Sequence, residues 1–286
     1  MQTSQNTSNL HWYDRPWAAF MFFTRLPLWR LHQPPQEAYR SVVEWWPLVG
    51  WLTGGVMAGV LYVGSIFLPY TIAVLLAIVS RMLLTGALHE DGLADFFDGF
   101  GGGTSRERIL AIMKDSHIGT YGTLSLIMYM ALLFLAICSL SPQYAPFFIL
   151  AADPYAKMLS AQAVQMLPYA RDEQTAKSGV VYRKYGLLSG IGLTFQGLLP
   201  LTLIALIILN SPLLLEGVGG RPHSSSFILH SSFLYVPALV MYFLYRYIWR
   251  RLRGYTGDCC GALFQLIELS FYLTAVFNTA VFGFAN

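Results

Sequence analysis

Charged side chains are scarce in this sequence, since 12% of its 286 residues are Asp, Glu, Lys or Arg while 55% are hydrophobic. A water-soluble domain ordinarily carries about twice that charged share. The mean hydropathy of +0.51 points the same way. The composition therefore excludes a soluble globular chain and is typical of a protein with several membrane-spanning helices.

Cysteine is also rare, and the three present, Cys138, Cys259 and Cys260, have no C-x-x-C spacing. The sequence therefore predicts neither a disulfide framework nor a zinc site. The polar start MQTSQNTSNL lacks a short apolar core with a small-residue cleavage site, so no cleaved signal peptide is expected. The net charge of +3 is explained by cations beside the membrane, and no nucleic-acid partner is expected.

Long apolar runs fill most of the chain. Crossing about 30 Å of hydrocarbon takes roughly 20 helical residues. Seven runs qualify, near residues 45–68, 71–88, 121–140, 147–167, 186–209, 231–249 and 259–284. The sequence therefore predicts an all-α, polytopic membrane helix bundle of about seven transmembrane helices, forming a single membrane-embedded domain over residues 1–286.

The first part of the chain is rich in tryptophan, with six of the seven Trp residues within the first 51 positions. Indole rings favour the lipid headgroup layer. Residues 15–25 are therefore expected to form an interfacial or re-entrant helix rather than an eighth span. This helix belongs to a cytoplasmic N-terminal segment, residues 1–44.

The cations alternate between the connections of the predicted spans. Fifteen of the 18 Lys and Arg residues precede the first span, lie between spans two and three, follow span four, or end span six, and the opposite connections contain only Arg221. Cytoplasmic connections carry the excess of Lys and Arg. The sequence therefore predicts a cytoplasmic amino terminus and a carboxyl terminus on the opposite side.

One acidic island lies on the predicted cytoplasmic side, in HEDGLADFFDG at 89–99. Asp91, Asp95 and Asp98 stand at i, i+4 and i+7, which places them within about 60° on one helical face. Neighbouring carboxylates repel unless a cation offsets them, and oxygen ligands suit Mg²⁺ or Mn²⁺. Although a solvated acidic loop is the alternative, the spacing favours a metal site in a cytoplasmic segment spanning residues 89–120.

The residues after this island resemble an anion-binding loop. GFGGGTSRER, which begins at Gly99, combines glycines with Arg106 and Arg108. Glycines let backbone N–H groups approach an anion, and arginines pair with phosphate. Carboxylates, a divalent metal, a glycine loop and cations together are the parts needed to bind a diphosphate and transfer a phosphoryl-type group.

Ionisable groups also occur within the apolar runs. Asp153 and Lys157 stand at i, i+4 in the fourth run and are expected to neutralise one another, either as a structural pair or as a substrate contact. Arg81 is expected to snorkel or to reach toward the acids. Asp258 opens the last run, and Glu268 lies ten residues deeper, where it requires a polar cavity or a partner.

Six blocks of the chain, in order, resemble the cobalamin synthase family, the adenosylcobinamide-GDP ribazoletransferases of bacterial and archaeal membranes. They are FFTRLP at 22–27, PLVG at 47–50, HEDGLADFFDG at 89–99, IMKDSHIGTYG at 112–122, YAR at 169–171 and TGDCCGA at 256–262. The acidic block is the most specific of them. The resemblance implies a multi-pass enzyme of the bacterial cytoplasmic (inner) membrane, with its active site on the cytoplasmic side.

The resemblance also implies a reaction, in which a hydroxyl of α-ribazole or its 5′-phosphate attacks the corrinoid-linked phosphate of adenosylcobinamide-GDP with the assistance of Mg²⁺, and GMP leaves. It implies roles for twelve residues: Asp91, Asp95, Asp98 and Glu90 as metal ligands; His89, Asp258, Lys114 and Asp115 as catalytic groups; and Arg106, Arg108, Arg171 and Gly99 as phosphate-binding groups. Position 90 is commonly apolar in the family, so Glu90 has the alternative of facing water.

Two other functions compete with this one. D-x-x-D-G at 95–99 matches the start of the CDP-alcohol phosphotransferase motif, but the second acidic helix of that motif is absent from the sequence. A divalent-cation transporter would place acids from several spans near the bilayer midplane, whereas most acids here lie at one margin. The sequence leaves open the number of metal ions, the identity of the base and the oligomeric state, and it is compatible with a homo-oligomer.

Overall fold

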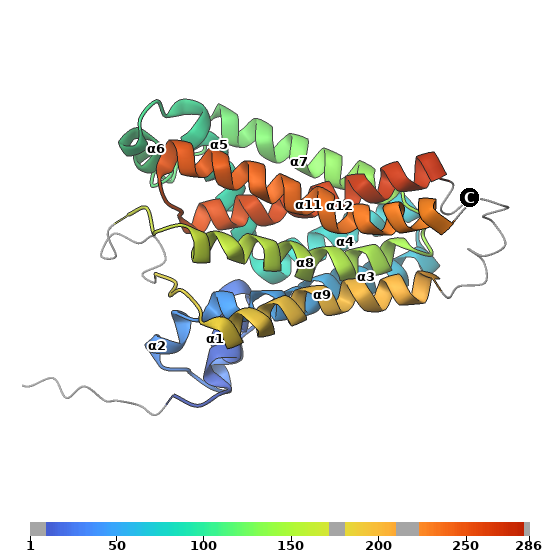
Figure 1. The fold of residues 1–286 in the computed structure, drawn as a ribbon, viewed down its shortest axis with the longest axis horizontal. Helices are drawn as coiled ribbons and strands as arrows, with labels where there is room; N and C mark the ends of the chain where they lie inside the picture. The colour runs from blue at the N-terminus through green and yellow to red at the C-terminus, as the bar shows by residue number, and fades with distance from the viewer. Residues whose placement is uncertain (1–9, 172–180, 210–222, 283–286) are drawn as a thin grey trace, which may run out of the picture.

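The computed structural model describes residues 10–171, 181–209 and 223–282, which form helices joined by turns, with no β-strand among them. Figure 1 shows the long helices side by side in one bundle. They are α3 (Trp46–Phe67), α4 (Tyr70–Thr85), α5 (Leu88–Gly102), α7 (Thr120–Cys138), α8 (Ala145–Met166), α9 (Leu187–Leu209), α11 (His223–Leu252) and α12 (Gly257–Phe282). The short ones are α1 (Asp14–Phe23), η1 (Leu28–Arg30), α2 (Gln36–Tyr39), η2 (Val42–Trp45) and α6 (Arg106–Ile112).

The predicted all-α membrane bundle is confirmed. Within the described ranges, three helices are long and apolar enough to cross a membrane, Val42–Phe67, Thr120–Cys138 and Gly257–Ala280, and the bent pair α4 and α5 is a fourth if it counts as one span. Every one of the seven predicted runs contains a long helix (α3, α4, α7, α8, α9, α11 or α12). The number of seven spans itself stays a prediction.

Helix α8 lies in the middle of the bundle and packs against α3, α9 and α12. The contact with α3 is close because α3 has glycines there. A Cβ added to Gly50 would lie 2.8 Å from the Pro154 Cα, and one added to Gly54 would lie 3.1 Å from the Asp153 Cβ. Small residues thus let two apolar helices approach until their backbones nearly touch.

A sharp turn separates α4 from α5 and decides where the acidic residues lie. Gly86 and Ala87 both adopt the left-handed conformation, with φ of 65° and 55°, and the two helices meet at 88°. The Arg25 side chain fills the space in which a Gly86 side chain would stand. Helix α5 therefore leaves the direction of α4 and packs against α12, α7 and α6.

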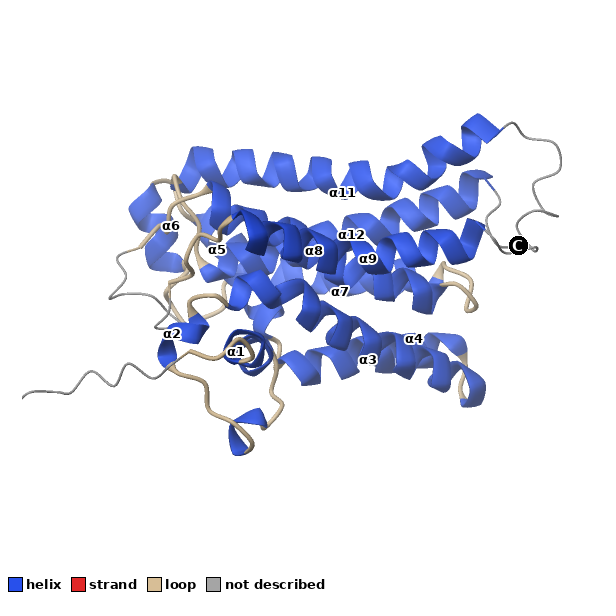
Figure 2. Ribbon diagram, turned by 60° about the horizontal axis from the view of Figure 1, so that its bottom comes forward, coloured by secondary structure: helices blue, strands red, loops and turns tan. Residues whose placement is uncertain are grey.

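The short helices gather at one end of the bundle. In Figures 1 and 2, α1, α2 and α6 lie at the end where α5 also lies, while α12 finishes at the other end. Helix α1 has 10 residues and is thus about 15 Å long, half of what a membrane crossing needs. This confirms a short helix in place of an eighth span.

Candidate active site

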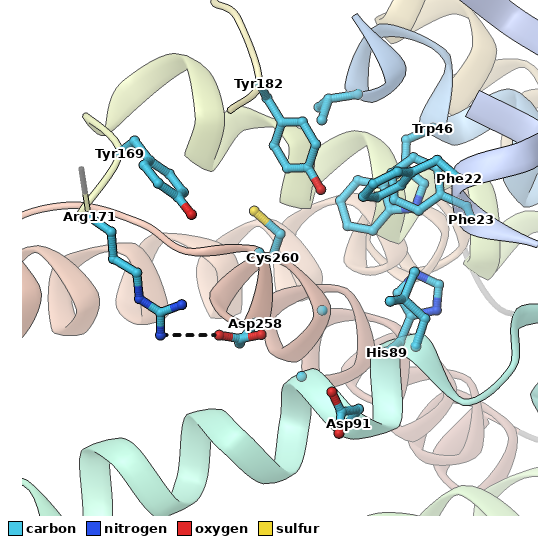
Figure 3. A pocket seen from close by; sticks show the side chains of 15 residues that line it. Phe22, Phe23, Trp46, His89, Asp91, Tyr169, Arg171, Tyr182, Asp258 and Cys260 are labelled. Carbon is cyan, nitrogen blue, oxygen red and sulfur yellow. Dashed lines mark ion pairs between the residues drawn. The ribbon is translucent and has the colours of Figure 1, made fainter. Parts of the chain in front are cut away.

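A cavity of about 200 Å³ opens where the first turns of α5 and α12 meet. Segments from different parts of the chain supply its wall, as Figure 3 shows. The lining residues are Phe22, Phe23, Val43, Trp46, Leu88, His89, Asp91, Gly92, Tyr169, Arg171, Tyr182, Gly257, Asp258, Cys260 and Gly261. Four of the predicted site residues, His89, Asp91, Arg171 and Asp258, therefore share one cavity.

Two glycines allow α5 and α12 to cross closely at this cavity. A Cβ added to Gly92 would lie 3.2 Å from the Asp258 Cα, and one added to Gly261 would lie 3.4 Å from the His89 carbonyl oxygen. Both neighbours are backbone atoms, which cannot rotate away as a side chain can. The close crossing brings His89 and Asp91 of α5 beside Asp258 of α12.

Backbone pairing holds Arg171 over the start of α12. Tyr255 donates its N–H to the Pro168 carbonyl and accepts from the Ala170 N–H, both at 2.9 Å. The Arg171 Nη2 then lies 3.9 Å from the Asp258 Oδ2, and the two side chains are 5% and 11% exposed. Figure 3 shows this ion pair at the charged end of the cavity. A guanidinium beside a carboxylate in a sheltered site is suited to binding a phosphate.

Arg106 supports this arrangement instead of facing the cavity. Its Nη2 donates to the Ala170 carbonyl at 2.6 Å and its Nε donates to the Leu252 carbonyl at 3.0 Å. The guanidinium therefore ties the segment that carries Arg171 to the end of α11. The Arg106 guanidinium thus already bonds two carbonyls, and its contact with phosphate stays a prediction.

The His89 ring lies among aromatic rings. Its centroid is 4.7 Å from that of Phe264, 5.8 Å from that of Trp46 and 6.3 Å from that of Phe23. The side chain is 3% exposed, and its Nε2 has no hydrogen-bond partner within the described part of the chain. The packing fixes the ring plane, so the imidazole is held in one orientation beside the cavity.

The acidic island is helical, as its spacing predicted. Asp91 is exposed and Asp95 half-buried, whereas Asp98 is turned toward α7. The Asp98 Oδ2 accepts the Gly119 N–H at 2.7 Å and its Oδ1 accepts the Gly122 N–H at 2.8 Å. Asp98 therefore caps the first turn of α7.

The Glu90 side chain is buried inside the protein. The alternative in which it faces water is wrong, because the side chain is 5% exposed and its Oε2 is buried. It follows His89 on α5, and one residue in a helix turns the side chain by about 100°. Glu90 is therefore directed into the protein, away from the mouth that Asp91 borders.

The predicted glycine loop is also wrong. Gly99, Gly101 and Gly102 belong to the last turns of α5, which continues to Gly102. A Cβ on Gly99 would lie 2.4 Å from the Met113 Cγ, so this residue packs against the connection that follows α6. The glycines permit tight packing of helices; they do not form an open cradle for an anion.

Three further predicted residues lie outside the cavity wall: Arg108, Lys114 and Asp115 are all exposed. Asp115 accepts the backbone N–H of His117 at 3.0 Å, and the His117 Nδ1 lies 2.7 Å from the same Oδ1. The hydrogen bond with the His117 ring lowers the pKa of Asp115 below its ordinary value. Asp115 is thus an ionised carboxylate near neutral pH.

Two carboxylates on the acidic face of α5 lie where they can share a divalent cation with a phosphate substrate. The described residues contain no group of three or more His, Cys, Asp or Glu side chains arranged around a common ion position. Mg²⁺ often takes only one or two carboxylates and completes its shell with water and substrate phosphate oxygens. Asp91 and Asp95, one turn apart on α5, supply oxygen donors of that kind, so the residues fit Mg²⁺ bound together with a phosphate substrate.

The interior charges form one cluster that the sequence predicted only in part. Asp153 pairs with Lys157, as expected for a structural pair, and Glu268 finds its partner in Arg81. The Thr53 hydroxyl joins them, 2.8 Å from the Asp153 Oδ2 and 3.0 Å from the Lys157 Nζ. All of these side chains are at most 3% exposed. The charges of two cationic and two acidic side chains therefore balance inside the bundle.

The aromatic residues of the wall were missed altogether as site residues. Phe22, Phe23, Trp46, Tyr169 and Tyr182 occur in stretches whose apolar side chains look like those of any membrane helix or interfacial segment. Phe22, Phe23 and Tyr169 stand in two of the family-like blocks, FFTRLP and YAR, which were the available signal. Trp46 belongs to the tryptophan-rich start of the chain, for which the sequence predicts membrane anchoring.

The chain is similar to known proteins over most of its length. The family described as cobalamin-5-phosphate synthase matches residues 15–276. An adenosylcobinamide-GDP ribazoletransferase of Leptothrix cholodnii is 37% identical over 89% of this chain and 92% of its own length. Those of Leptospira interrogans and Vibrio parahaemolyticus are 34% and 32% identical, over 91% and 90% of this chain and 94% and 90% of their own lengths. No solved structure matches. The chain thus belongs to the cobalamin-5-phosphate synthase family.

Proposed function

We propose that this chain transfers the adenosylcobinamide-phosphate group from adenosylcobinamide-GDP to α-ribazole or α-ribazole 5′-phosphate and releases GMP. Relatives with that activity in their names cover about 90% of the chain. The observation that carries the proposal is the cavity in which Asp91, Asp258 and Arg171 meet. It combines acidic oxygens with a guanidinium, which a transfer between phosphate esters requires.

The reaction exchanges one phosphorus–oxygen bond for another. A ribose hydroxyl oxygen bonds to the corrinoid-linked phosphorus, and the bond from that phosphorus to the GMP oxygen breaks, so that GMP leaves with the electron pair. The hydroxyl proton passes to a base, for which the cavity offers the Asp258 carboxylate and the His89 imidazole. Arg171 neutralises phosphate oxygens, and Asp258 holds its guanidinium in place.

We propose that Asp91 and Asp95 hold Mg²⁺, with Mn²⁺ as a substitute. The bound ion would neutralise charge on the diphosphate of the donor substrate. Asp98 contributes indirectly, because it fixes α7 against α5. The two carboxylates on one face of α5 are what supports this assignment.

We propose that the site lies on the cytoplasmic side of a bacterial cytoplasmic membrane. Helices α1, α5 and α6 lie at the same end of the bundle (Figure 1), and this end carries Arg106, Arg108 and Lys114. Cations accumulate on the cytoplasmic side. Labelling of an engineered cysteine at Lys114 by a membrane-impermeant maleimide should succeed in inverted vesicles and fail in intact cells; the reverse result would overturn the orientation.

A divalent-cation transporter fits the interior less well. Such a transporter needs acidic side chains from several spans that can bind a cation. Asp153 of α8 and Glu268 of α12 are such acids, but each already pairs with a cationic side chain. The family match supports the cobalamin reaction over a CDP-alcohol phosphotransferase.

Purified protein in detergent should release GMP from adenosylcobinamide-GDP when α-ribazole 5′-phosphate and Mg²⁺ are supplied. Chelation with EDTA should stop turnover, and added Mg²⁺ should restore it. Asp95→Asn should lose activity while Glu37→Gln, on an exposed acid paired with Arg40, should keep it. Absence of GMP release together with turnover of a CDP-alcohol would refute the proposal.

A further inference from the structure

The cavity has two chemically different ends. Asp91, Arg171 and Asp258 border one end, and Phe22, Phe23 and Trp46 close the other (Figure 3). The Tyr169 and Tyr182 side chains extend from the same wall toward the space between the ends. A ligand that fills this cavity therefore has a flat apolar part and a polar or charged part.

The volume limits which part of the substrates can enter. Sites for drug-sized ligands enclose about 300–1,000 Å³, and this cavity encloses about 200 Å³. A corrin macrocycle is far too large for it. A heterocycle of two fused rings fits, and the two proposed substrates offer one each: the guanine of the nucleotide and the benzimidazole of ribazole.

The polarity of the aromatic end distinguishes these two bases. Phe22 and Phe23 have no polar side-chain atom, and the Trp46 indole is a donor only. The Trp46 Nε1 is buried and has no hydrogen-bond partner in the described part of the structure. Guanine carries N–H groups on its edge that need acceptors, and leaving them unpaired is costly. The base of a ribazole has no N–H group and a single acceptor nitrogen.

We propose that the aromatic end of the cavity binds the benzimidazole base of α-ribazole, an inference that rests on the proposed function. Flat rings stack favourably on aromatic side chains, and the Phe22, Phe23 and Trp46 rings line this end of the cavity. The ribose is then directed toward Arg171 and Asp258, at the end where the phosphate is attacked. The guanine of the donor substrate binds elsewhere.

Phe22→Leu tests this assignment, because Phe22 is only half-buried and its loss should not unfold the protein. Removal of one stacking ring should weaken α-ribazole binding, and raise its KM, by about two- to tenfold. The KM for adenosylcobinamide-GDP should not change. Phe20→Leu is the matched control, since Phe20 lies on the same helix but not in the cavity wall.

Binding of α-ribazole alone, measured by titration calorimetry in detergent, separates this inference from the proposed reaction. Wild-type protein should bind α-ribazole without the second substrate, and GMP should not displace it. No binding by the wild type, displacement by GMP, or an effect of Phe22→Leu on the nucleotide substrate alone would each overturn the inference. Failure of turnover with intact α-ribazole binding would instead refute only the proposed reaction.

Discussion

The Arg81 guanidinium of α4 forms an ion pair with the Glu268 carboxylate of α12, 187 positions away in the chain, and neither side chain is more than 3% exposed. The Tyr272 hydroxyl donates to the same Glu268 oxygen at 3.1 Å, and the Arg81 Nη1 also lies 3.8 Å from the Asp153 Oδ2. Because Lys157 pairs with Asp153, the cluster has no net formal charge. Charges of this kind are stable in a membrane interior only as a set.

Removing one charged side chain from the buried cluster should lower the stability of the protein more than removing an oppositely charged pair. Arg81→Met leaves an uncompensated buried carboxylate, which typically costs about 3–5 kcal/mol. The double variant Arg81→Met with Glu268→Leu leaves Lys157 and Asp153 paired and should recover much of that stability. Thermal unfolding in detergent measures both, with Ser80→Ala as the control. A double variant less stable than Arg81→Met would contradict the neutral-cluster description.

Replacement by asparagine should have different effects at Asp91 and Asp98, which stand seven positions apart on α5: it should lower turnover at the first and stability at the second. Asp91→Asn should lower turnover at least about tenfold, as loss of a metal-supporting group does, without altering the melting temperature. In the wild type both Asp98 oxygens accept backbone N–H groups at the start of α7. In Asp98→Asn one of these oxygens is replaced by an NH₂ group, which cannot accept, so the free energy of unfolding should fall by about 1 kcal/mol or more. Melting curves together with GMP release distinguish them. Equal melting temperatures for the two variants would argue against the capping role.

The turn between α4 and α5 should tolerate no side chain at Gly86. With φ of 65°, Gly86→Ala should destabilise the protein by about 1–2 kcal/mol from backbone strain alone, and the added methyl group would overlap Arg25. Gly55→Ala in α3 is the control, because no atom lies within 4 Å of its added Cβ, and there alanine should be neutral or stabilising. Similar melting temperatures for both variants would show that the turn is not constrained.

Asp14 should make the amino-terminal segment sensitive to acid. Burial raises the pKa of this carboxyl, but the hydrogen bond with His32 and the one from the His11 N–H outweigh it and leave the pKa below its ordinary value of 3.8. A carboxyl with a lowered pKa stabilises the fold above its ordinary pKa, and this stabilisation is lost as the pH falls through the lowered value.

The difference in melting temperature between wild type and Asp14→Asn should therefore be largest above pH 5 and should shrink as the pH falls below 3.8. Glu37→Gln, on an exposed acid, should show no such change. If the difference in melting temperature between wild type and Asp14→Asn grew as the pH fell, the ionised Asp14 carboxylate would not be the stabilising form.

The local sequence pattern was sufficient to predict the helices of this protein and the charged face of α5. Runs of about 20 apolar residues must be helical in a membrane because every backbone N–H and C=O needs a partner within the segment. The spacing of Asp91, Asp95 and Asp98 predicted a helical acidic face for the same local reason, since helix periodicity depends only on neighbouring residues. Asp153 and Lys157 could be paired because they stand one turn apart.

Tertiary packing decided what those residues do. Asp98 was assigned to a metal site, yet it caps α7, because a carboxylate takes whichever N–H groups the folded chain brings near. The family resemblance implies Glu90 as a metal ligand, with exposure to water as the alternative, yet the side chain is buried inside the protein. The helices and their charged faces follow from local sequence pattern. The cavity shared by His89, Asp258 and the aromatic wall depends instead on contacts between segments distant in the chain, which periodicity does not encode.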